Sequence, residues 1–268
     1  MPPSATDRFI EGPDYVQSLA RGLSVLRSFD AAHTSMTLSE AAARSGLARA
    51  AARRALLTLA HEGYVAAAGG RFRLLPRALE LGFAYLASLR LPELAQPEME
   101  ALSRRVNESC SLSVLDGQEI VYVARVPVRK VVAITLGVGA RLPAYATSMG
   151  RVLLAGLPDD RLHAWLAACR LAPLTPRTIR SRAALRAEIA RVRRQGYAMV
   201  RQELDPGLLS VAVPIRDRRG EVIAALNVGT GIGHDAAKRA RNLFLPGLRA
   251  AQAAVEWALA HQFLATGS

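Results

Sequence analysis

The feature that most constrains this chain is a pair of short helices separated by a glycine turn. Thr37-Leu38-Ser39-Glu40 is a capping box, in which the Thr37 side chain caps a helix and the Glu40 side chain reaches back to the cap. We expect that helix to cover 38–45 and to end at Gly46, which favours a C-terminal cap. A second helix follows after three residues, and two short helices joined in this way are typical of a helix-turn-helix.

A hairpin follows the second helix directly. Gly63 ends that helix, and two short apolar segments then flank Gly69-Gly70, a turn sequence that favours a β-hairpin. A hairpin in this position is a wing, so the sequence predicts a winged helix-turn-helix over residues 15–76. The expected elements are a helix over 18–29, a loop over 30–36, helices over 38–45 and 49–62, and strands over 64–67 and 72–74.

The arginines of this region favour DNA as a partner. No acidic residue occurs between Ala41 and Ala60, and the arginines there fall in or beside the expected recognition helix. Arginine can bind guanine O6 and N7 in the major groove or clamp phosphate, and arginines on a wing suit the backbone or the minor groove. The alternative is an arginine-rich solvated face. The predicted DNA-contacting residues are Ser39, Arg44, Arg49, Arg53, Arg54, Arg71 and Arg73.

Composition narrows the class of protein further. The 268 residues carry a formal net charge of +13, which favours a polyanionic partner, although an arginine-rich composition can also reflect codon bias. The sequence has neither an apolar run of membrane-spanning length nor a signal peptide, so we expect a cytoplasmic protein with no membrane partner. Cys110 and Cys169 do not form a zinc or disulfide pattern, and neither a metal nor a cofactor is expected.

A larger α+β domain is expected after the winged helix. Residues 1–14 are predicted to be disordered, 77–90 to form a linker helix, and 91–265 to form a domain with an antiparallel sheet. Asp116-Gly117 and the turn at 217–220 each separate two apolar segments, which predicts two hairpins. A domain of this kind after a winged helix is usually a sensor of small molecules. The expected strands are 111–115, 119–125, 131–136, 210–215 and 221–228, and the expected helices are 94–106, 148–157, 159–168, 181–195 and 235–263, the last interrupted at Pro246.

Evidence for an enzyme in the sequence is weak. Gly229-Thr230-Gly231-Ile232-Gly233 follows an apolar run, but His234 stands where a dinucleotide fingerprint has glycine or alanine. We interpret this segment as a flexible exit from the last strand. The sequence shows neither a nucleophile with its base nor histidines at metal-ligand spacing, so no catalytic residue is predicted.

The segment 139–150 predicts a binding site for a carboxylic acid. A loop carrying Thr147 and Ser148 leads into a helix, whose free N–H groups and dipole favour a carboxylate, and Tyr145 would add an aromatic wall. Plain helix capping by Thr147 and Ser148 explains these residues equally well, and the two roles are compatible. Arg125 and Arg141 are either carboxylate partners or solvated charges at strand ends. The predicted effector-binding residues are Tyr145, Ala146, Thr147, Ser148, Met149, Leu208, Ser210, Asn227, Arg125 and Arg141.

Several segments spread over residues 15–259 are similar to those of a known family. They include VQSLARGL at 16–23, LSEAA at 38–42, LPAYATSMGR at 142–151, GYA at 196–198 and GLLSVAVPI at 207–215. Together they resemble the IclR family of transcription regulators, and LSVLDG at 112–117 and VYVARVP at 121–127 resemble its subgroup controlling aromatic catabolism. Members of that subgroup respond to protocatechuate, 4-hydroxybenzoate or β-ketoadipate. The resemblance implies a GAF-like effector domain, dimers through the DNA-binding half, often tetramers, and regulation of an adjacent operon.

The resemblance also bears on the ligand. In glyoxylate-type members the acid is held by the helix N-terminus and four side chains, and the matching positions here are Val200, Ser210, Asn227 and Gly229. Only two of these are polar, which implies a larger and partly apolar acid. The resemblance therefore implies a regulator whose binding to a double-stranded DNA operator is controlled by an aromatic or pathway-derived acid. The alternatives are a regulator with a vestigial sensor and an enzyme fused to a winged helix.

Overall fold

The computed structural model describes residues 15–30, 32–82, 90–128 and 136–261. They belong to two compact units, one ending at Ser88 and the other beginning at Leu89. The predicted disordered segment 1–14 and most of the predicted strand 131–136 lie outside the described residues. None of the helices in the described part of the chain is long and apolar enough to cross a membrane.

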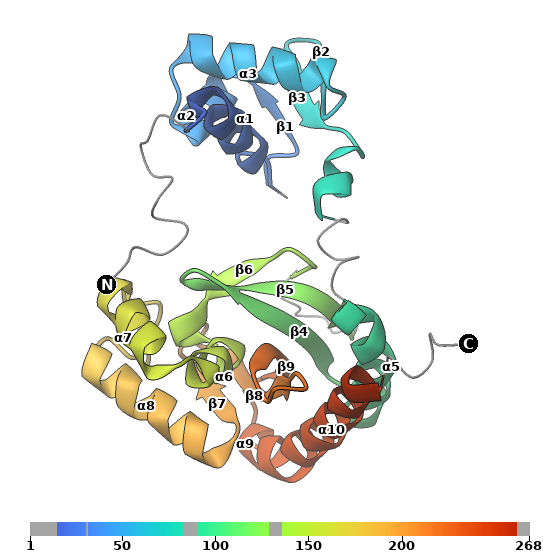
Figure 1. The fold of residues 1–268 in the computed structure, drawn as a ribbon, viewed down its shortest axis with the longest axis vertical. Coiled ribbons are helices and arrows are strands. Elements are labelled where there is room, and N and C mark those ends of the chain that lie inside the picture. Colours follow the sequence, from blue (N-terminus) through green and yellow to red (C-terminus); the bar gives the residue numbers. More distant parts are fainter. Residues whose placement is uncertain (1–14, 31, 83–89, 129–135, 262–268) are drawn as a thin grey trace. The chain divides into compact units, whose positions relative to one another are not determined.

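The N-terminal unit packs three helices against a three-stranded sheet (Figure 1). Its core gathers one or two apolar side chains from each element, among them Val25, Met36, Leu56 and Val65. The predicted helices and the wing are confirmed within one or two residues. The elements are α1 (Gln17–Arg27), β1 (Ser35–Thr37), α2 (Leu38–Ser45), α3 (Arg49–His61), β2 (Val65–Ala68) and β3 (Arg71–Leu74).

The capping box forms as predicted. The Glu40 N–H donates to Thr37 Oγ1 at 3.3 Å, and the Glu40 carboxylate accepts from the Thr37 N–H at 2.7 Å. Gly46 ends α2 with φ +68°, in the left-handed region that glycine adopts without strain. The capping box therefore fixes the start of α2, and Gly46 fixes its end.

The prediction of a loop over 30–36 is wrong at its end. Residues 35–37 form β1, which pairs with β3 and places Met36 opposite Phe72. The wing is therefore the outer part of a sheet with the order β1-β3-β2. Met36 is buried in the core, so burial of this side chain favours the pairing. Of the predicted linker helix over 77–90, residues 78–82 are helical, Arg77 lies in a turn and Arg90 is the first residue of α5; 83–89 lie outside the described residues.

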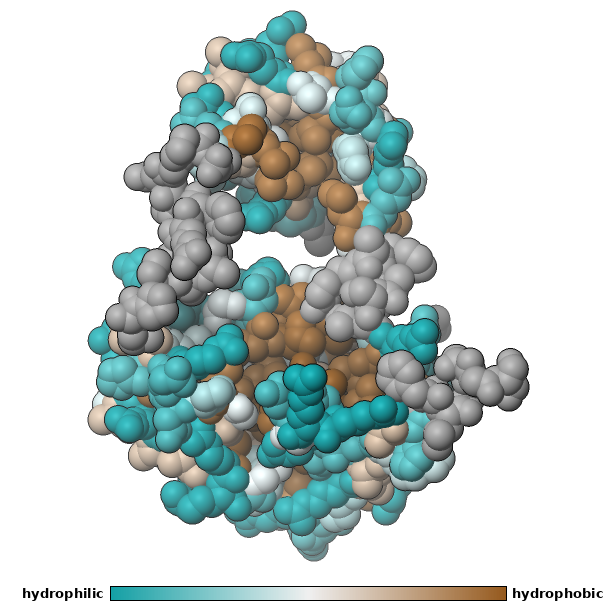
Figure 2. All heavy atoms as spheres, in the orientation of Figure 1, coloured by the Kyte–Doolittle hydropathy of each residue, from teal (hydrophilic) through white to brown (hydrophobic). Residues whose placement is uncertain are grey.

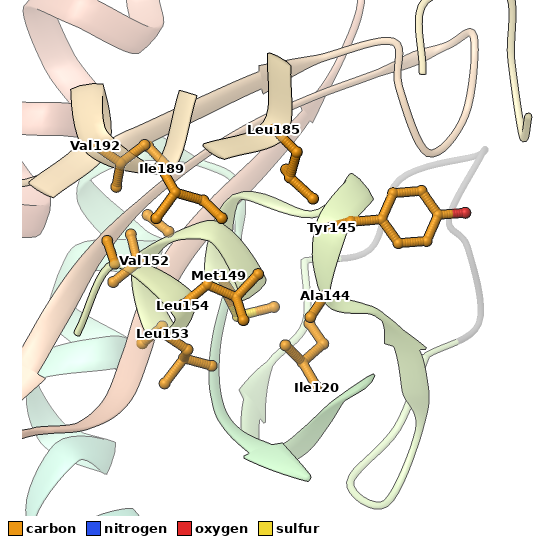
Figure 3. Packing of buried hydrophobic residues seen from close by; sticks show 14 of the residues in the cluster. Ile120, Ala144, Tyr145, Met149, Val152, Leu153, Leu154, Leu185, Ile189 and Val192 are labelled. Carbon is orange, nitrogen blue, oxygen red and sulfur yellow. The ribbon is translucent and has the colours of Figure 1, made fainter. Parts of the chain in front are cut away.

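The C-terminal unit is an antiparallel six-stranded sheet with the order β6-β5-β4-β9-β8-β7. Helices α6, α7 and α8 lie on one side of it and α5 and α10 on the other (Figure 1). An apolar cluster fills the space between the sheet and α6 to α8, with Met149, Leu154 and Ile189 at its centre (Figure 3). The elements are α5 (Arg90–Val106), β4 (Ser109–Asp116), β5 (Glu119–Val126), β6 (Arg141–Pro143), the 3₁₀ turn η2 (Ala144–Ala146), α6 (Ser148–Gly156), α7 (Asp159–Ala168), α8 (Arg182–Gln195), β7 (Ala198–Arg201), β8 (Leu208–Arg216), β9 (Val222–Gly231), α9 (Ala236–Arg239), the π-helical turn η3 (Ala240–Phe244) and α10 (Leu245–His261).

Three details of this unit differ from the prediction. The glycine-rich segment is not a flexible exit, because residues 229–231 belong to β9 and pair with β8. The short edge strands β6 and β7 were not predicted. The predicted interruption of the last helix at Pro246 lies slightly earlier: α9, the π-helical turn η3 and α10 follow one another directly, and η3 ends two residues before the proline, which has no N–H to donate within a helix.

Candidate functional site

A cavity of about 310 Å³ opens between the sheet and the start of α6. This volume falls in the range of small-molecule sites in proteins. Strands β4, β5, β8 and β9 and the segment 203–208 contribute to its walls. Eight of the ten predicted effector-binding residues line it: Arg125, Ala146, Thr147, Ser148, Met149, Leu208, Ser210 and Asn227.

The first turn of α6 presents hydrogen-bond donors at this cavity. Thr147 caps the helix, because its Oγ1 accepts from the Gly150 N–H at 3.1 Å and its carbonyl accepts from the Arg151 N–H. The first two N–H groups of the helix, those of Ser148 and Met149, have no partner within the helix. Ser148 Oγ is buried and lacks a hydrogen-bond partner among the described residues. The helix dipole adds a partial positive charge here, so this turn can hold a carboxylate.

The floor of the cavity carries a second buried atom without a partner. Asn227 is 7% exposed on β9, and its Oδ1 accepts no hydrogen bond from the described part of the chain. The cross-strand neighbour of Asn227 on β4 is Ser111, whose hydroxyl also faces the cavity. A buried polar atom without a partner costs about 1–3 kcal/mol. Ser148 and Asn227 therefore mark places where a ligand would complete the hydrogen bonding.

A bulge in β5 brings two further side chains to the cavity. The pairing with β4 passes from Ala124 opposite Leu112 to Tyr122 opposite Ser113, and so skips one residue. Because of this bulge, Tyr122 and Arg125 both line the cavity although strict alternation would separate them. Burial raises the pKa of Tyr122 to about 12, so its hydroxyl stays protonated at neutral pH. Tyr122 was not predicted as a site residue, since the bulge that aims it leaves no local sequence signal.

Tyr145 and Arg141, also predicted to bind the effector, do not line the cavity. The Tyr145 side chain points away from Ile120 and Met149 (Figure 3), and its hydroxyl donates to the Ala172 carbonyl at 2.9 Å. Arg141 lies exposed on β6 and forms ion pairs of 2.7 Å with Asp116 and Glu119. The expectation that Tyr145 forms an aromatic wall of the cavity is therefore wrong; Ala146, the next residue, lies there instead.

Two carboxylates of the cavity wall are held by cations of the protein. Glu203 pairs with Arg151 at 2.5 Å, and Glu108 pairs with Arg239 at 3.0 Å. The Glu108 carboxylate also accepts from the Thr230 hydroxyl at 2.8 Å. The two arginines offset the negative charges of Glu108 and Glu203. These carboxylates therefore oppose an anionic ligand much less than free carboxylates would.

The predicted DNA-contacting residues lie in the N-terminal unit in two groups. Arg53 and Arg54 on α3 and Arg73 on β3 are exposed, and none of them forms an ion pair within the described chain. The others take part in contacts inside the unit. Arg49 donates to Ser39 Oγ at 2.8 Å, Arg44 pairs with Asp30 at 2.5 Å, and Arg71 donates to the Ser35 carbonyl at 2.7 Å.

Two family models match this chain. The IclR helix-turn-helix domain matches residues 18–69, and the C-terminal domain of the bacterial transcriptional regulator IclR matches residues 83–257. The chain belongs to the IclR family. It is a DNA-binding transcription regulator, and the predicted fold, a winged helix-turn-helix followed by an α+β domain, is confirmed.

Named regulators and a ligand-bound crystal structure are similar to this chain over most of its length. The chain is 42% identical over 251 residues to the Pca regulon regulatory protein of Pseudomonas putida, covering 93% of this chain and 86% of that protein. It is 35% identical over 223 residues to the p-hydroxybenzoate hydroxylase transcriptional activator of Acinetobacter baylyi, covering 81% and 82%. An IclR homolog from Microbacterium hydrocarbonoxydans, crystallised with 4-hydroxybenzoate, is 30% identical with a TM-score of 0.79, covering 91% of this chain and 99% of that one.

Proposed function

We propose that this IclR-family regulator binds a small carboxylic acid of aromatic catabolism in the cavity beside α6, and that the acid changes its affinity for operator DNA. The observation that carries the proposal is that Ser148 Oγ and Asn227 Oδ1, two buried polar atoms without partners, line one cavity. Buried polar groups in proteins are nearly always hydrogen-bonded, so an exception of this kind indicates a ligand. The candidate acids are 4-hydroxybenzoate, protocatechuate and β-ketoadipate.

The carboxylate of the acid lies at the first turn of α6. The N–H groups of Ser148 and Met149 and the Ser148 hydroxyl donate to it, while the carbon skeleton lies against the apolar side chains of Val200 and Leu208. The acid is bound and released unchanged in the cytoplasm, so the protein acts as a sensor and not as an enzyme. Control of DNA binding requires that the acid bind one arrangement of the regulator more tightly than another.

DNA binding rests on α3 and the wing. Arg53 and Arg54 enter or border the major groove from α3, and Arg73 contacts the backbone from the wing. The regulator acts as a dimer. Support for the dimer comes from the N-terminal unit, where α1 leaves Leu19 63% exposed and Leu23 39% exposed. Figure 2 shows hydrophobic surface on the visible face of this unit.

The sensor proposal predicts that Ser148→Ala weakens acid binding without destabilising the free protein. The substitution removes a hydroxyl that has no partner until the acid binds, so the free energy of unfolding stays equal or rises slightly, while acid affinity falls about tenfold. The measurement is thermal shift and calorimetry of the full chain with each candidate acid. At about a hundred times Kd an acid stabilises the wild type by about 2.7 kcal/mol.

The control for this experiment is Ser24→Ala, which removes an exposed serine hydroxyl of α1 far from the cavity in sequence. It should leave acid affinity unchanged. If none of the candidate acids raises the melting temperature of the wild type, the proposed ligand class is wrong and the DNA-binding role stands alone.

The DNA-binding proposal predicts that the double variant Arg53→Ala/Arg54→Ala loses operator affinity. Each arginine that binds a base bidentately contributes about 1–3 kcal/mol of discrimination, and each that neutralises a phosphate contributes about 0.9 to the salt slope. We expect a loss of about tenfold to several hundredfold, measured by fluorescence anisotropy on an operator selected with the wild type. The matched control is Arg104→Ala/Arg105→Ala, another adjacent exposed pair, on α5. Equal losses in the two double variants would show that overall charge, and not the α3 face, determines binding.

A further inference from the structure

We propose that the C-terminal unit carries a second DNA-binding surface, which contacts the phosphates of duplex DNA flanking the operator. This surface is a row of arginines on α8 and on the two segments next to it, and we call it the basic face. The inference goes beyond the proposed function but rests on the operator binding proposed above for α3 and the wing. The basic face consists of Arg177, Arg180, Arg182, Arg186, Arg193 and Arg201.

The first support is the place of the net charge in the chain. From the start of α7 to the end of β7, ten arginines stand against three acidic residues, Asp159, Asp160 and Glu188. The excess of seven positive charges is more than half of the formal net charge of +13. The described part of the N-terminal unit has nine arginines and four acidic residues, an excess of only five. The winged helix-turn-helix therefore carries the smaller share of the positive charge.

The second support is the alignment of the arginines along α8. Arg182, Arg186 and Arg193 follow one another at intervals of four and seven residues, so they share one side of the helix. Arg182 donates to the Cys169 carbonyl at 3.2 Å, at the end of α7. Arg193 pairs with Asp159 at 2.6 Å, at the start of α7. The row therefore runs along the length of α7, which lies beside α8 (Figure 1).

The other members of the basic face continue this row beyond the start of α8. The hydroxyl of Thr175 donates to the Gln202 carbonyl at 2.6 Å. The segment that carries Arg177 and Arg180 is therefore held against the end of β7, where Arg201 lies. Arg180 is the residue before the N-cap of α8, so the basic face passes from this contact directly onto the helix.

The third support is the shortage of counterions within the basic face. Arg177, Arg180 and Arg201 are exposed, and their side chains form neither a hydrogen bond nor an ion pair with a described residue. Asp159 serves the far end of the row: the hydrogen bond from Arg193 and, less strongly, the charge of Arg186 hold the pKa of this carboxyl below its usual range. Arginines gathered in this way repel one another. DNA phosphates offset that repulsion and release their own counterions.

The composition of the basic face favours DNA over an acidic protein as its partner. Protein interfaces have an apolar centre in which charged residues are rare, whereas DNA interfaces are polar and strongly positive. Among the exposed large apolar residues of the described chain, Leu174 alone lies between residues 159 and 201. Every exposed position of α8 is occupied by arginine or alanine. Such a surface offers charge to a polyanion and little apolar area to a protein.

The test compares two duplexes, a minimal operator selected with the wild type and the same operator lengthened by about 20 base pairs, about two helical turns, on each side. Fluorescence anisotropy of the full-length protein at about 50 to 200 mM salt gives the affinity and the salt slope for each duplex. The wild type should show a steeper slope on the longer duplex. In Arg180→Ala/Arg186→Ala that slope should fall by about 1.8, about 0.9 for each lost phosphate contact, and the affinity by about tenfold. The same variant should bind the minimal operator as the wild type does, which also shows that it is folded.

Two further variants serve as controls. Arg104→Ala/Arg105→Ala removes the same charge from α5, on the other side of the sheet from α8, and should leave both slopes unchanged (Figure 1). Arg180→Lys/Arg186→Lys keeps the charge of the basic face. Its slope on the longer duplex should stay near the wild-type value, because lysine binds phosphate as a point charge.

Three results would contradict the inference. Equal slopes of the wild type and Arg180→Ala/Arg186→Ala on the longer duplex would overturn it, leave operator binding by α3 intact, and favour an acidic protein as the partner of the basic face. Equal losses on the two duplexes, or an equal loss in Arg104→Ala/Arg105→Ala, would also overturn it, since overall charge would then explain the salt dependence. A wild type that binds the minimal operator no better than an unrelated duplex would overturn the proposed operator binding and this inference with it.

Discussion

Replacing Gly150 by alanine should cost the C-terminal unit about 3 kcal/mol or more of its free energy of unfolding. A Cβ at this position would lie 2.1 Å from the Ala144 carbonyl oxygen and 2.3 Å from its Cα, both backbone atoms that cannot rotate aside. The 3₁₀ turn over 144–146 and the first turn of α6 would have to separate. Because Ser148 and Met149 belong to that turn, acid binding should be lost as well.

Urea denaturation followed by tryptophan fluorescence measures this effect, since both tryptophans, Trp165 and Trp257, lie in the C-terminal unit. The control is Gly233→Ala in the same unit, where an added Cβ meets no atom within 4 Å and φ is not in the left-handed region. Its unfolding free energy should stay within about 0.5 kcal/mol of the wild type. An equally mild effect in Gly150→Ala would show that η2 and α6 are not fixed against each other.

The parts of this fold that could be predicted from the sequence are those determined by neighbouring residues. The capping box at Thr37 and the Gly46 that ends α2 are local hydrogen-bonding and backbone preferences, and both form as predicted. The two hairpins are local in the same sense. Strand β1 was missed because its partner, β3, is distant in sequence, and neither its length nor its composition marks it as a strand.

The candidate site shows the same limit. The sequence predicted the carboxylate-binding turn at Ser148 because capping and helix dipoles act locally. It did not predict the direction of the Tyr145 side chain. That direction is fixed by a contact distant in sequence, the hydrogen bond from the Tyr145 hydroxyl to the Ala172 carbonyl. It did not predict Tyr122, and it left open whether Arg125 was a ligand partner or a solvated charge. The positions of Tyr122 and Arg125 at the cavity depend on the bulge in β5, which becomes visible only when β5 is paired with β4.

Breaking the buried ion pair between Arg151 and Glu203 should cost about 3–5 kcal/mol of unfolding free energy. The Arg151 side chain is 2% exposed and contacts Glu203 at 2.5 Å and Glu188 at 3.6 Å, and its Nε donates to the Tyr145 carbonyl. In Arg151→Met the Glu203 carboxylate would keep the Ile179 N–H at 3.2 Å but lose its counterion. An isolated buried charge is the source of the expected loss.

The double-mutant cycle separates the pair from its surroundings. Glu203→Gln should also destabilise strongly, because Arg151 then keeps its hydrogen bond to the Tyr145 carbonyl but has only the longer ion pair with Glu188 among the described carboxylates. The double variant Arg151→Met/Glu203→Gln carries no unpaired charge, so it should be more stable than the sum of the single losses predicts by about 1–3 kcal/mol. The control is Arg141→Met, which removes an exposed arginine with two carboxylate partners and should cost about 1 kcal/mol or less.

This pair also connects the two sides of the candidate site. Arg151 lies in α6 just after its first turn, and Glu203 begins the segment 203–208, which lines the cavity. The hydroxyl of Thr178 fixes the Glu203 carbonyl at 2.7 Å, so the carboxylate is held from a rigid backbone. The double variant should therefore bind the acid more weakly than the wild type, even though it regains part of the unfolding free energy that the single variants lose. Strictly additive losses in unfolding free energy, with acid affinity unchanged, would show that Arg151 and Glu203 act independently and do not hold the cavity together.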